Sequence, residues 1–216
     1  KDQIDPKTGI QIISLHGINK KPKVEQLNGI EIMVFDLQDV GVRFFTYLST
    51  LHYVMEACAE NNVPLIILDR PNPNLHYVDG PVMEEAYTSF LGMHPVPIVY
   101  GMTIGEYAKM INGEGWLKEG ILCKLSVIPV KNYNRKSTYE LSVRPSPNLP
   151  NPQAISLYPS LCLLEPTVIS VGRGTYFQFQ IYGHPKLPKN DFTFTPLPNF
   201  GAKNPKLEDH LCYGKN

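Results

Sequence analysis

The first 70 residues alternate strand-like and helix-like segments with short links between them. The run 31–36, Glu-Ile-Met-Val-Phe-Asp, predicts a strand, and the run 64–69, Pro-Leu-Ile-Ile-Leu-Asp, is apolar along its length, as central parallel strands are. Between these two runs, apolar residues recur at helical spacing over 45–61. A strand, a helix and a strand joined by short links form a right-handed crossover in a parallel sheet. The sequence therefore predicts an α/β fold with a Rossmann-like parallel sheet.

The rest of the chain has weaker signals, partly because it contains 20 prolines, four of them within 144–152. Thr103 and Glu106 have the spacing of a helix capping box. We expect two lobes with a cleft between them, a Rossmann-like lobe over 1–100 that lacks its N-terminal part and a smaller Pro-rich α/β lobe over 101–216 that lacks its C-terminal part. The further elements that we expect are strands over 11–15, 121–130 and 176–182 and helices over 104–111 and 158–165.

Composition and motifs exclude several function classes. Twenty basic and 20 acidic residues give a net charge of zero, which disfavours a nucleic-acid binder. No apolar run approaches the ~18 residues that a membrane span needs. The sequence has no Gly-x-Gly-x-x-Gly, no phosphate-binding loop, no Gly-x-Ser-x-Gly and no Cys-x-x-Cys. We therefore expect no cofactor, no metal site and no disulfide framework, and we expect Cys58, which lies on the apolar stripe of the predicted helix, to be buried.

Polar side chains follow the two predicted strands at the point where each ends. Parallel α/β sheets carry their functional groups outside the carboxyl ends of the strands, and acids, guanidinium groups and amides together suit a polar, anionic small molecule. An alternative is that the two aspartates cap helices and the arginines neutralise them. The side chains expected at this rim are Asp36, Gln38, Asp39, Arg43, Asp69, Arg70 and Asn72.

Glu165 is the other carboxylate of interest, because it ends the apolar stretch 161–164. Burial raises the pKa of a carboxyl group, as a general acid requires. The alternative is a helix-end glutamate that pairs with Arg173.

Several stretches together resemble one family. They include Val-Phe-Asp-Leu-Gln-Asp-Val-Gly-Val-Arg, Asp-Arg-Pro-Asn-Pro, Gly-Met-Thr-Ile-Gly-Glu and Gly-Arg-Gly-Thr, and they follow in order along nearly the whole chain. On these stretches, the chain resembles the NamZ-type exo-β-N-acetylmuramidases, a family long described as a domain of unknown function. The matching stretches are 34–47, 69–73, 78–81, 101–106, 146–150, 158–159, 163–165 and 172–175.

The resemblance implies a glycosidase that releases terminal N-acetylmuramic acid from peptidoglycan fragments, with a muropeptide or muramyl sugar as its partner. It points to Glu165, Asp36 and Asp69 as catalytic candidates. The lactyl carboxylate of a muramyl sugar suits the arginine fork of Arg43, Arg70 or Arg173. The complete set of predicted substrate-binding residues is Gln38, Asp39, Arg43, Tyr47, Arg70, Asn72, Asn148, Tyr158 and Arg173.

The sequence departs from the family pattern at several positions. The family's upstream Gly-Pro-Glu-His-Gly, whose glutamate is its leading catalytic candidate, does not occur in these 216 residues. Val171 stands where the family has a glutamate, Tyr100 where it has a histidine and Pro166 where it has a glycine. We therefore expect this chain alone to be a poor hydrolase. A muropeptide-binding protein without catalysis is the alternative function, and an intracellular small-molecule sensor is a third.

The chain opens at Lys1 without an initiator methionine. We expect an extracytoplasmic location, periplasmic or secreted, with a targeting segment removed, and a cytoplasmic location stays open. The sequence does not indicate an oligomeric state.

Overall fold

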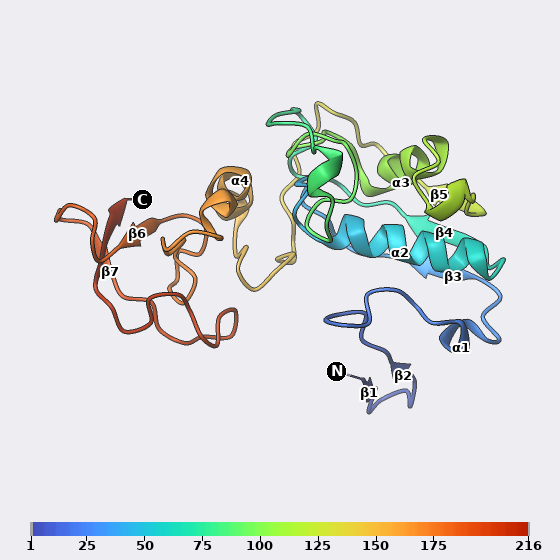
Figure 1. Ribbon diagram of the computed structural model, residues 1–216, viewed down its shortest axis with the longest axis horizontal. Coiled ribbons are helices and arrows are strands. Elements are labelled where there is room, and N and C mark those ends of the chain that lie inside the picture. Colours follow the sequence, from blue (N-terminus) through green and yellow to red (C-terminus); the bar gives the residue numbers. More distant parts are fainter. Residues whose placement is uncertain (1, 216) are drawn as a thin grey trace. The chain divides into compact units, whose positions relative to one another are not determined.

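The computed structural model describes residues 2–215 and divides the chain into two compact units. The first, which we call unit 1, extends to Asn134, and the second, unit 2, begins at Arg135. Figure 1 shows both units.

Unit 1 contains a parallel sheet with the order β3-β4-β5. Its strands are β3 (Met33–Phe35), β4 (Leu65–Leu68) and β5 (Leu125–Ile128). Both strand pairs are parallel, with Phe35 opposite Ile67 and Ile67 opposite Val127. The predicted α/β fold with a parallel sheet is confirmed, and the expected strand over 121–130 is shorter than its pattern indicates.

Two helices connect and cover this sheet (Figure 1). Helix α2 (Tyr47–Glu60) leads from β3 to β4, and α3 (Ile104–Gly113) precedes β5. Their apolar faces pack against one face of the sheet in a core that includes Leu51, Leu65 and Tyr107. Burial of such side chains stabilises the unit by about 25 cal/mol for each Å² of apolar surface removed from water.

The two helices lie within two residues of the ranges that their sequences predict, 45–61 and 104–111. The Thr103 hydroxyl accepts a hydrogen bond from the Glu106 amide at 3.2 Å, and the Glu106 carboxylate accepts one from the Thr103 amide at 3.0 Å. The predicted capping box is therefore confirmed. Helix α2 ends before Asn62, which has a φ of 56° in the left-handed region that stops a helix. Cys58 on α2 is fully buried, as expected, and all four cysteines are free.

The N-terminal segment does not join the parallel sheet. Strand β1 (Gln3–Ile4) pairs antiparallel with β2 (Gln11–Ile12), and the short helix α1 (Val24–Leu27) follows. The strand expected over 11–15 is thus shorter and forms a hairpin, because Gly9, with a φ of 70°, turns the chain back on β1. A long connection between β4 and α3 contains the 3₁₀ turn η1 (Glu85–Tyr87), and η2 (Lys118–Gly120) precedes β5.

Unit 2 combines one helical segment with a small antiparallel sheet. Helix α4 (Pro152–Leu161) continues into the 3₁₀ turn η3 (Cys162–Leu164). The sheet has the order β6-β8-β7. Its strands are β6 (Tyr182–His184), β7 (Thr193–Phe194) and β8 (Cys212–Lys215).

Two expectations for unit 2 are wrong in their boundaries. The helix begins at Pro152, six residues before the start that we expected, because the Asn151 side chain caps it and proline is tolerated in the first turn. The strand expected over 176–182 begins only at Tyr182. Phe179 has a φ of 53°, which is incompatible with an extended strand.

Helix α3 and strand β5 belong to unit 1 and lie within residues 101–134. Units 1 and 2 are defined by contacts between their residues, and such units need not coincide with the two predicted lobes. The lobe boundary near residue 100 and the cleft between the lobes stay predictions.

Candidate functional site

Asp36 and Asp69 follow neighbouring parallel strands, so they lie at the same edge of the sheet. The Arg70 Nε donates to Asp36 Oδ1 at 2.6 Å, and the two side chains are 42% and 43% exposed. The hydrogen bond from Arg70 lowers the pKa of Asp36. The rim therefore presents one ionised, solvent-accessible carboxylate beside a guanidinium group.

Asp69 at the same edge is engaged by the N-terminus of α3. Its carboxylate accepts hydrogen bonds from the Thr103 hydroxyl at 2.7 Å and from the Gly105 amide at 2.8 Å. A Cβ at residue 105 would lie 2.8 Å from the Asp69 Cγ, so only glycine permits this approach. The contacts correspond to the helix-capping alternative, and a catalytic role for Asp69 stays a prediction.

Gln38 and Asn72 bind backbone groups near the rim. The Gln38 Nε2 donates to the carbonyl oxygens of Asp39 and Pro71, both at 2.7 Å. The buried Asn72 side chain donates to the Met102 carbonyl at 2.8 Å. Both amides hold the segments that leave β3 and β4, and this arrangement leaves less of them available to a ligand.

Arg43 fastens the long connection between β4 and α3. Its Nη1 donates to the carbonyl oxygen of Pro81 at 3.0 Å and to that of Val96. Gly92 also lies close, since a Cβ there would be 3.5 Å from the Arg43 Nε. Arg43 therefore has a structural task in addition to any contact with substrate.

Asp39 is buried beneath the rim, with 4% of its surface exposed. Its Oδ2 accepts hydrogen bonds from the Tyr100 hydroxyl and from the Gly41 amide, whereas its Oδ1 has no hydrogen-bond partner within residues 2–215. Burial raises the pKa of Asp39 to about 6. Tyr100 thus binds a carboxyl group that is almost entirely buried.

Tyr47 is the first residue of α2 and is partly exposed. Its ring meets that of Phe45 edge-on, with centroids 5.0 Å apart. Stacking of Tyr47 on a sugar stays a prediction.

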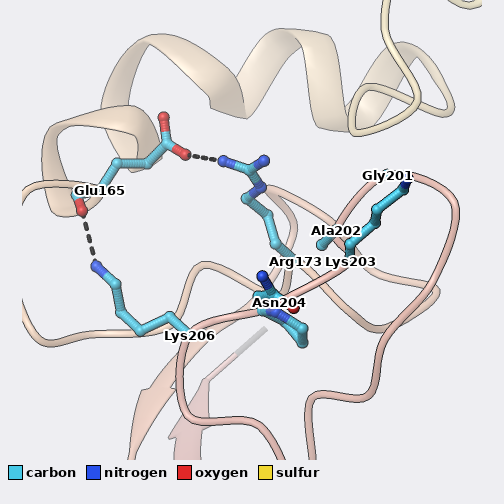
Figure 2. A pocket seen from close by; sticks show the side chains of 8 residues that line it. Glu165, Arg173, Gly201, Ala202, Lys203, Asn204 and Lys206 are labelled. Atoms are coloured by element: carbon cyan, nitrogen blue, oxygen red, sulfur yellow. Dashed lines mark hydrogen bonds and ion pairs between the residues drawn. The ribbon is translucent and has the colours of Figure 1, made fainter.

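Glu165 and Arg173 line a cavity of about 380 Å³ in unit 2, and we call this cavity the unit 2 pocket. The Arg173 Nη1 donates to Glu165 Oε1 at 2.8 Å, and Figure 2 shows the two side chains turned toward each other. The Cys162 thiol donates to Glu165 Oε2 at 3.2 Å. The carboxylate thus meets a guanidinium group instead of the apolar surroundings that we expected, because Leu163 of the preceding turn is exposed.

The other wall of the unit 2 pocket is a loop from the C-terminal part of the chain. The Lys206 Nζ reaches the backbone carbonyl oxygens of Glu165, at 2.7 Å, and of Thr167. The residues that line the pocket are Glu165, Arg173, Gly201, Ala202, Lys203, Asn204, Pro205 and Lys206. The two lysines and Asn204 were not among the predicted site residues, because no local motif connects this loop to Glu165, some 40 residues earlier.

Asn148 and Tyr158 support unit 2 from within. The Asn148 Nδ2 donates to the Gly201 carbonyl at 2.9 Å, so this side chain holds the loop of the unit 2 pocket. Tyr158 is buried and meets Phe179 edge-on, with ring centroids 4.9 Å apart. Tyr158 lies in the core of unit 2, which corresponds to the alternative that we left open for it.

Within residues 2–215, no group of three histidine, cysteine, aspartate or glutamate side chains is placed to hold a metal ion. In the same part of the chain, every helix is too short or too polar to cross a membrane.

Two family models match the chain in succession. The model described as "Exo-beta-N-acetylmuramidase NamZ, N-terminal" matches residues 1–153, and its C-terminal counterpart matches residues 156–216. A curated relative, the "Peptidoglycan beta-N-acetylmuramidase NamZ" of Bacillus subtilis (strain 168), is 42% identical over 227 aligned positions. The alignment covers 98% of this chain and 54% of the relative, so the chain spans about half the length of that protein.

Two solved structures have the same fold, and both are DUF1343 family proteins from Bacteroides fragilis NCTC 9343. One is 50% identical to this chain with a TM-score of 0.94, and the other is 32% identical with a TM-score of 0.88. In both cases the match covers 99% of this chain and 59% of the solved chain.

Proposed function

The chain belongs to the NamZ family of exo-β-N-acetylmuramidases, and from this premise we propose that the protein releases terminal N-acetylmuramic acid from peptidoglycan fragments. One observation carries the proposal, which is the 42% identity to a peptidoglycan β-N-acetylmuramidase over 98% of the chain. The site chemistry is compatible with it, since each unit has a solvent-accessible carboxylate beside a guanidinium group.

Glycoside hydrolysis uses two carboxyl groups, one as the acid and the other as the nucleophile or base. Arg70 holds Asp36 in its ionised form, which suits a nucleophile or a base. Glu165 is the candidate carboxyl group of unit 2, because it is the carboxylate that lines the unit 2 pocket. Within unit 1, Arg70 beside Asp36 is the candidate contact for an anionic group of the substrate, and Asp69 positions α3.

A muropeptide-binding protein without catalysis is the second candidate. The feature that favours it is Val171, which is buried and apolar at a position where the family resemblance implies a glutamate. Both candidate functions predict binding of muramyl sugars, and only the hydrolase predicts turnover.

A chromogenic β-N-acetylmuraminide separates them. The proposed hydrolase releases the chromophore, and the Asp36→Asn and Glu165→Gln variants each lose at least about a hundredfold in rate, as for a missing acid or base. The matched controls are Asp191→Asn and Glu140→Gln, which change exposed carboxylates of the same kinds and should leave the rate unaltered.

The assay should be repeated with a longer form of the chain, since the curated relative is nearly twice as long. Binding of muramyl sugars without turnover in both forms would leave the binding protein as the function. Turnover that survives Glu165→Gln would refute a catalytic role for Glu165 and keep the hydrolase.

A further inference from the structure

Two aromatic side chains of unit 2 are almost entirely exposed. Tyr176 is 92% exposed and Phe200 is 86% exposed. Phe200 directly precedes Gly201, which lines the unit 2 pocket, and Tyr176 directly follows the Gly-Arg-Gly-Thr turn that supplies Arg173. The two loops that line the pocket therefore each carry an exposed aromatic residue, and exposed apolar residues on a surface are candidates for contact with a ligand.

The loops that carry these rings are fixed to each other. The Asn199 Nδ2 donates to the Thr175 carbonyl at 3.4 Å, and the Leu197 amide donates to the Gly174 carbonyl at 2.8 Å. Gly174 has a φ of 87°, and a Cβ there would lie 2.6 Å from the Pro205 Cβ. The backbone of one loop therefore packs directly on the other, and the walls of the pocket are preformed.

The pocket has an excess of positive charge. Arg173, Lys203 and Lys206 line it together with a single carboxylate, that of Glu165. Arg173 pairs with that carboxylate, and Lys206 binds two backbone carbonyl groups. Lys203 is exposed, and no hydrogen bond or ion pair of its side chain is found among the described residues; Figure 2 shows none to the other lining residues. Its ammonium group is available to an anion.

The size of the pocket suits a sugar. A volume of about 380 Å³ lies at the lower end of the range for small-molecule sites, which is ~300–1,000 Å³. The exposed rings of Tyr176 and Phe200, carried by the two loops that line the pocket, offer flat apolar surfaces, and a pyranose has an apolar face that can pack on such a surface.

We propose that the unit 2 pocket binds the carboxylate-bearing sugar of the substrate, with Lys203 contacting the lactyl carboxylate and Phe200 and Tyr176 packing against the ring. The proposal rests on the proposed function for the choice of sugar. It adds a specificity determinant, because Lys203 then distinguishes a muramyl sugar from a glucosaminyl sugar that lacks the lactyl group.

Isothermal titration calorimetry with N-acetylmuramic acid and with N-acetylglucosamine tests the proposal. Lys203→Ala should weaken the affinity for N-acetylmuramic acid about fivefold, as expected for a solvent-exposed ion pair, and leave that for N-acetylglucosamine unchanged. Lys203→Arg should retain the preference. Phe200→Ala should weaken the affinity for both sugars by the same factor.

Matched controls are Lys189→Ala, an exposed lysine of unit 2 outside the pocket lining, and Tyr87→Ala, an exposed aromatic residue of unit 1. Neither should change either affinity. Circular dichroism melting of each variant shows that the chain is folded, which is expected since the substituted side chains are exposed.

The outcomes separate this proposal from the proposed function. Muraminide hydrolysis together with a sugar preference that Lys203→Ala does not change would overturn the Lys203 subsite and keep the enzyme. A preference that depends on Lys203, without hydrolysis, would keep the subsite and leave a binding protein. Absence of binding of either sugar would overturn the subsite.

Discussion

Replacing His94 with glutamine should make the folding of this chain less sensitive to acid. His94 is 3% exposed and stacks on Trp116 with ring centroids 4.7 Å apart. Its Nε2 lies 2.9 Å from the His52 Nδ1, and its Nδ1 lies 3.1 Å from the Tyr107 hydroxyl. The His52 Nε2 lies 3.5 Å from a carboxylate oxygen of Glu56.

These contacts assign the protons when both rings are neutral. The Glu56 carboxylate accepts, so the His52 Nε2 carries the hydrogen and its Nδ1 accepts from the His94 Nε2. The His94 Nδ1 then accepts from the Tyr107 hydroxyl. Protonation of His52 would place two N–H groups against each other between the rings, and protonation of His94 would place its new Nδ1–H against the Tyr107 hydroxyl, which could then no longer donate to it. Burial also opposes the added charge.

Burial, with a smaller effect from the neighbouring His52, lowers the pKa of His94 to about 3 from an ordinary value of 6.5. The unfolded chain therefore binds this proton more tightly, so the stability is complete above pH 6.5 and falls as the pH drops toward 3. Between pH 7.5 and pH 5, the contribution of His94 to the free energy of unfolding falls by about 2 kcal/mol. This follows because pH 5 lies 1.5 pH units below the unfolded pKa of 6.5, and each unit costs about 1.4 kcal/mol.

Asp39 acts in the opposite direction, because burial raises its pKa to about 6 from 3.8 and acid then favours the folded state. This opposing gain, about 1.4 kcal/mol over the same pH interval, reduces the net change in the unmodified chain. The comparison between the chain and its His94→Gln variant removes it, since both carry Asp39.

Urea unfolding followed by circular dichroism at pH 7.5 and pH 5 measures the effect. The free energy of unfolding should fall by about 2 kcal/mol less in His94→Gln than in the unmodified chain. His16→Gln is the matched control, because His16 is an exposed histidine of the same unit, and it should behave like the unmodified chain. Equal losses in all three proteins would refute the assignment of a neutral, buried His94.

Three further predictions concern residues that the contacts mark as structural. Arg43→Met should lower the free energy of unfolding by about 2 kcal/mol in urea titrations, because two carbonyl groups lose a charged donor. Arg70→Met should lower it by less than about 1 kcal/mol, because the ion pair of Arg70 with Asp36 is solvent-exposed. Equal losses of stability in the two variants would contradict this order. Gly105→Ala should lower the melting temperature, at a cost of about 1–3 kcal/mol, since its Cβ would lie 2.6 Å from the Val127 Cγ1. Cys58 is fully buried and its thiol pKa is raised to about 12, so mass spectrometry should find it unalkylated by iodoacetamide until urea unfolds the chain; rapid labelling of the folded chain would contradict its burial.

The parallel sheet of unit 1 could be predicted because its signals are local. The apolar runs at β3 and β4 and the helical spacing of α2 each lie within one continuous segment, and the capping box of α3 needs only four residues. These patterns report burial on one face and a helix start directly, without knowledge of distant contacts.

Unit 2 was predicted less well because its strands depend on distant partners. Strand β8 lies between β6 and β7 and consists of four residues with two buried positions, a pattern too short to recognise. Phe179 takes a left-handed conformation within a run of aromatic and polar residues that otherwise favours a strand. The unit 2 pocket could not be predicted for the same reason, since its two walls are far apart in sequence.

The charged side chains of the rim and those of the unit 2 pocket also differ in how much they contribute to the fold. At the rim, Asp69 caps a helix and Arg43 binds two carbonyl groups, so removing either would disturb folding as well as binding. In the pocket, Lys203 has no such contact among the described residues, and the two loops that line the pocket each carry an exposed aromatic residue, Tyr176 or Phe200. A side chain that contributes little to the fold is free to be selected for its ligand. The residue types in the sequence indicated the arginines as the contacts for the substrate carboxylate, whereas the contacts in the structure indicate Lys203.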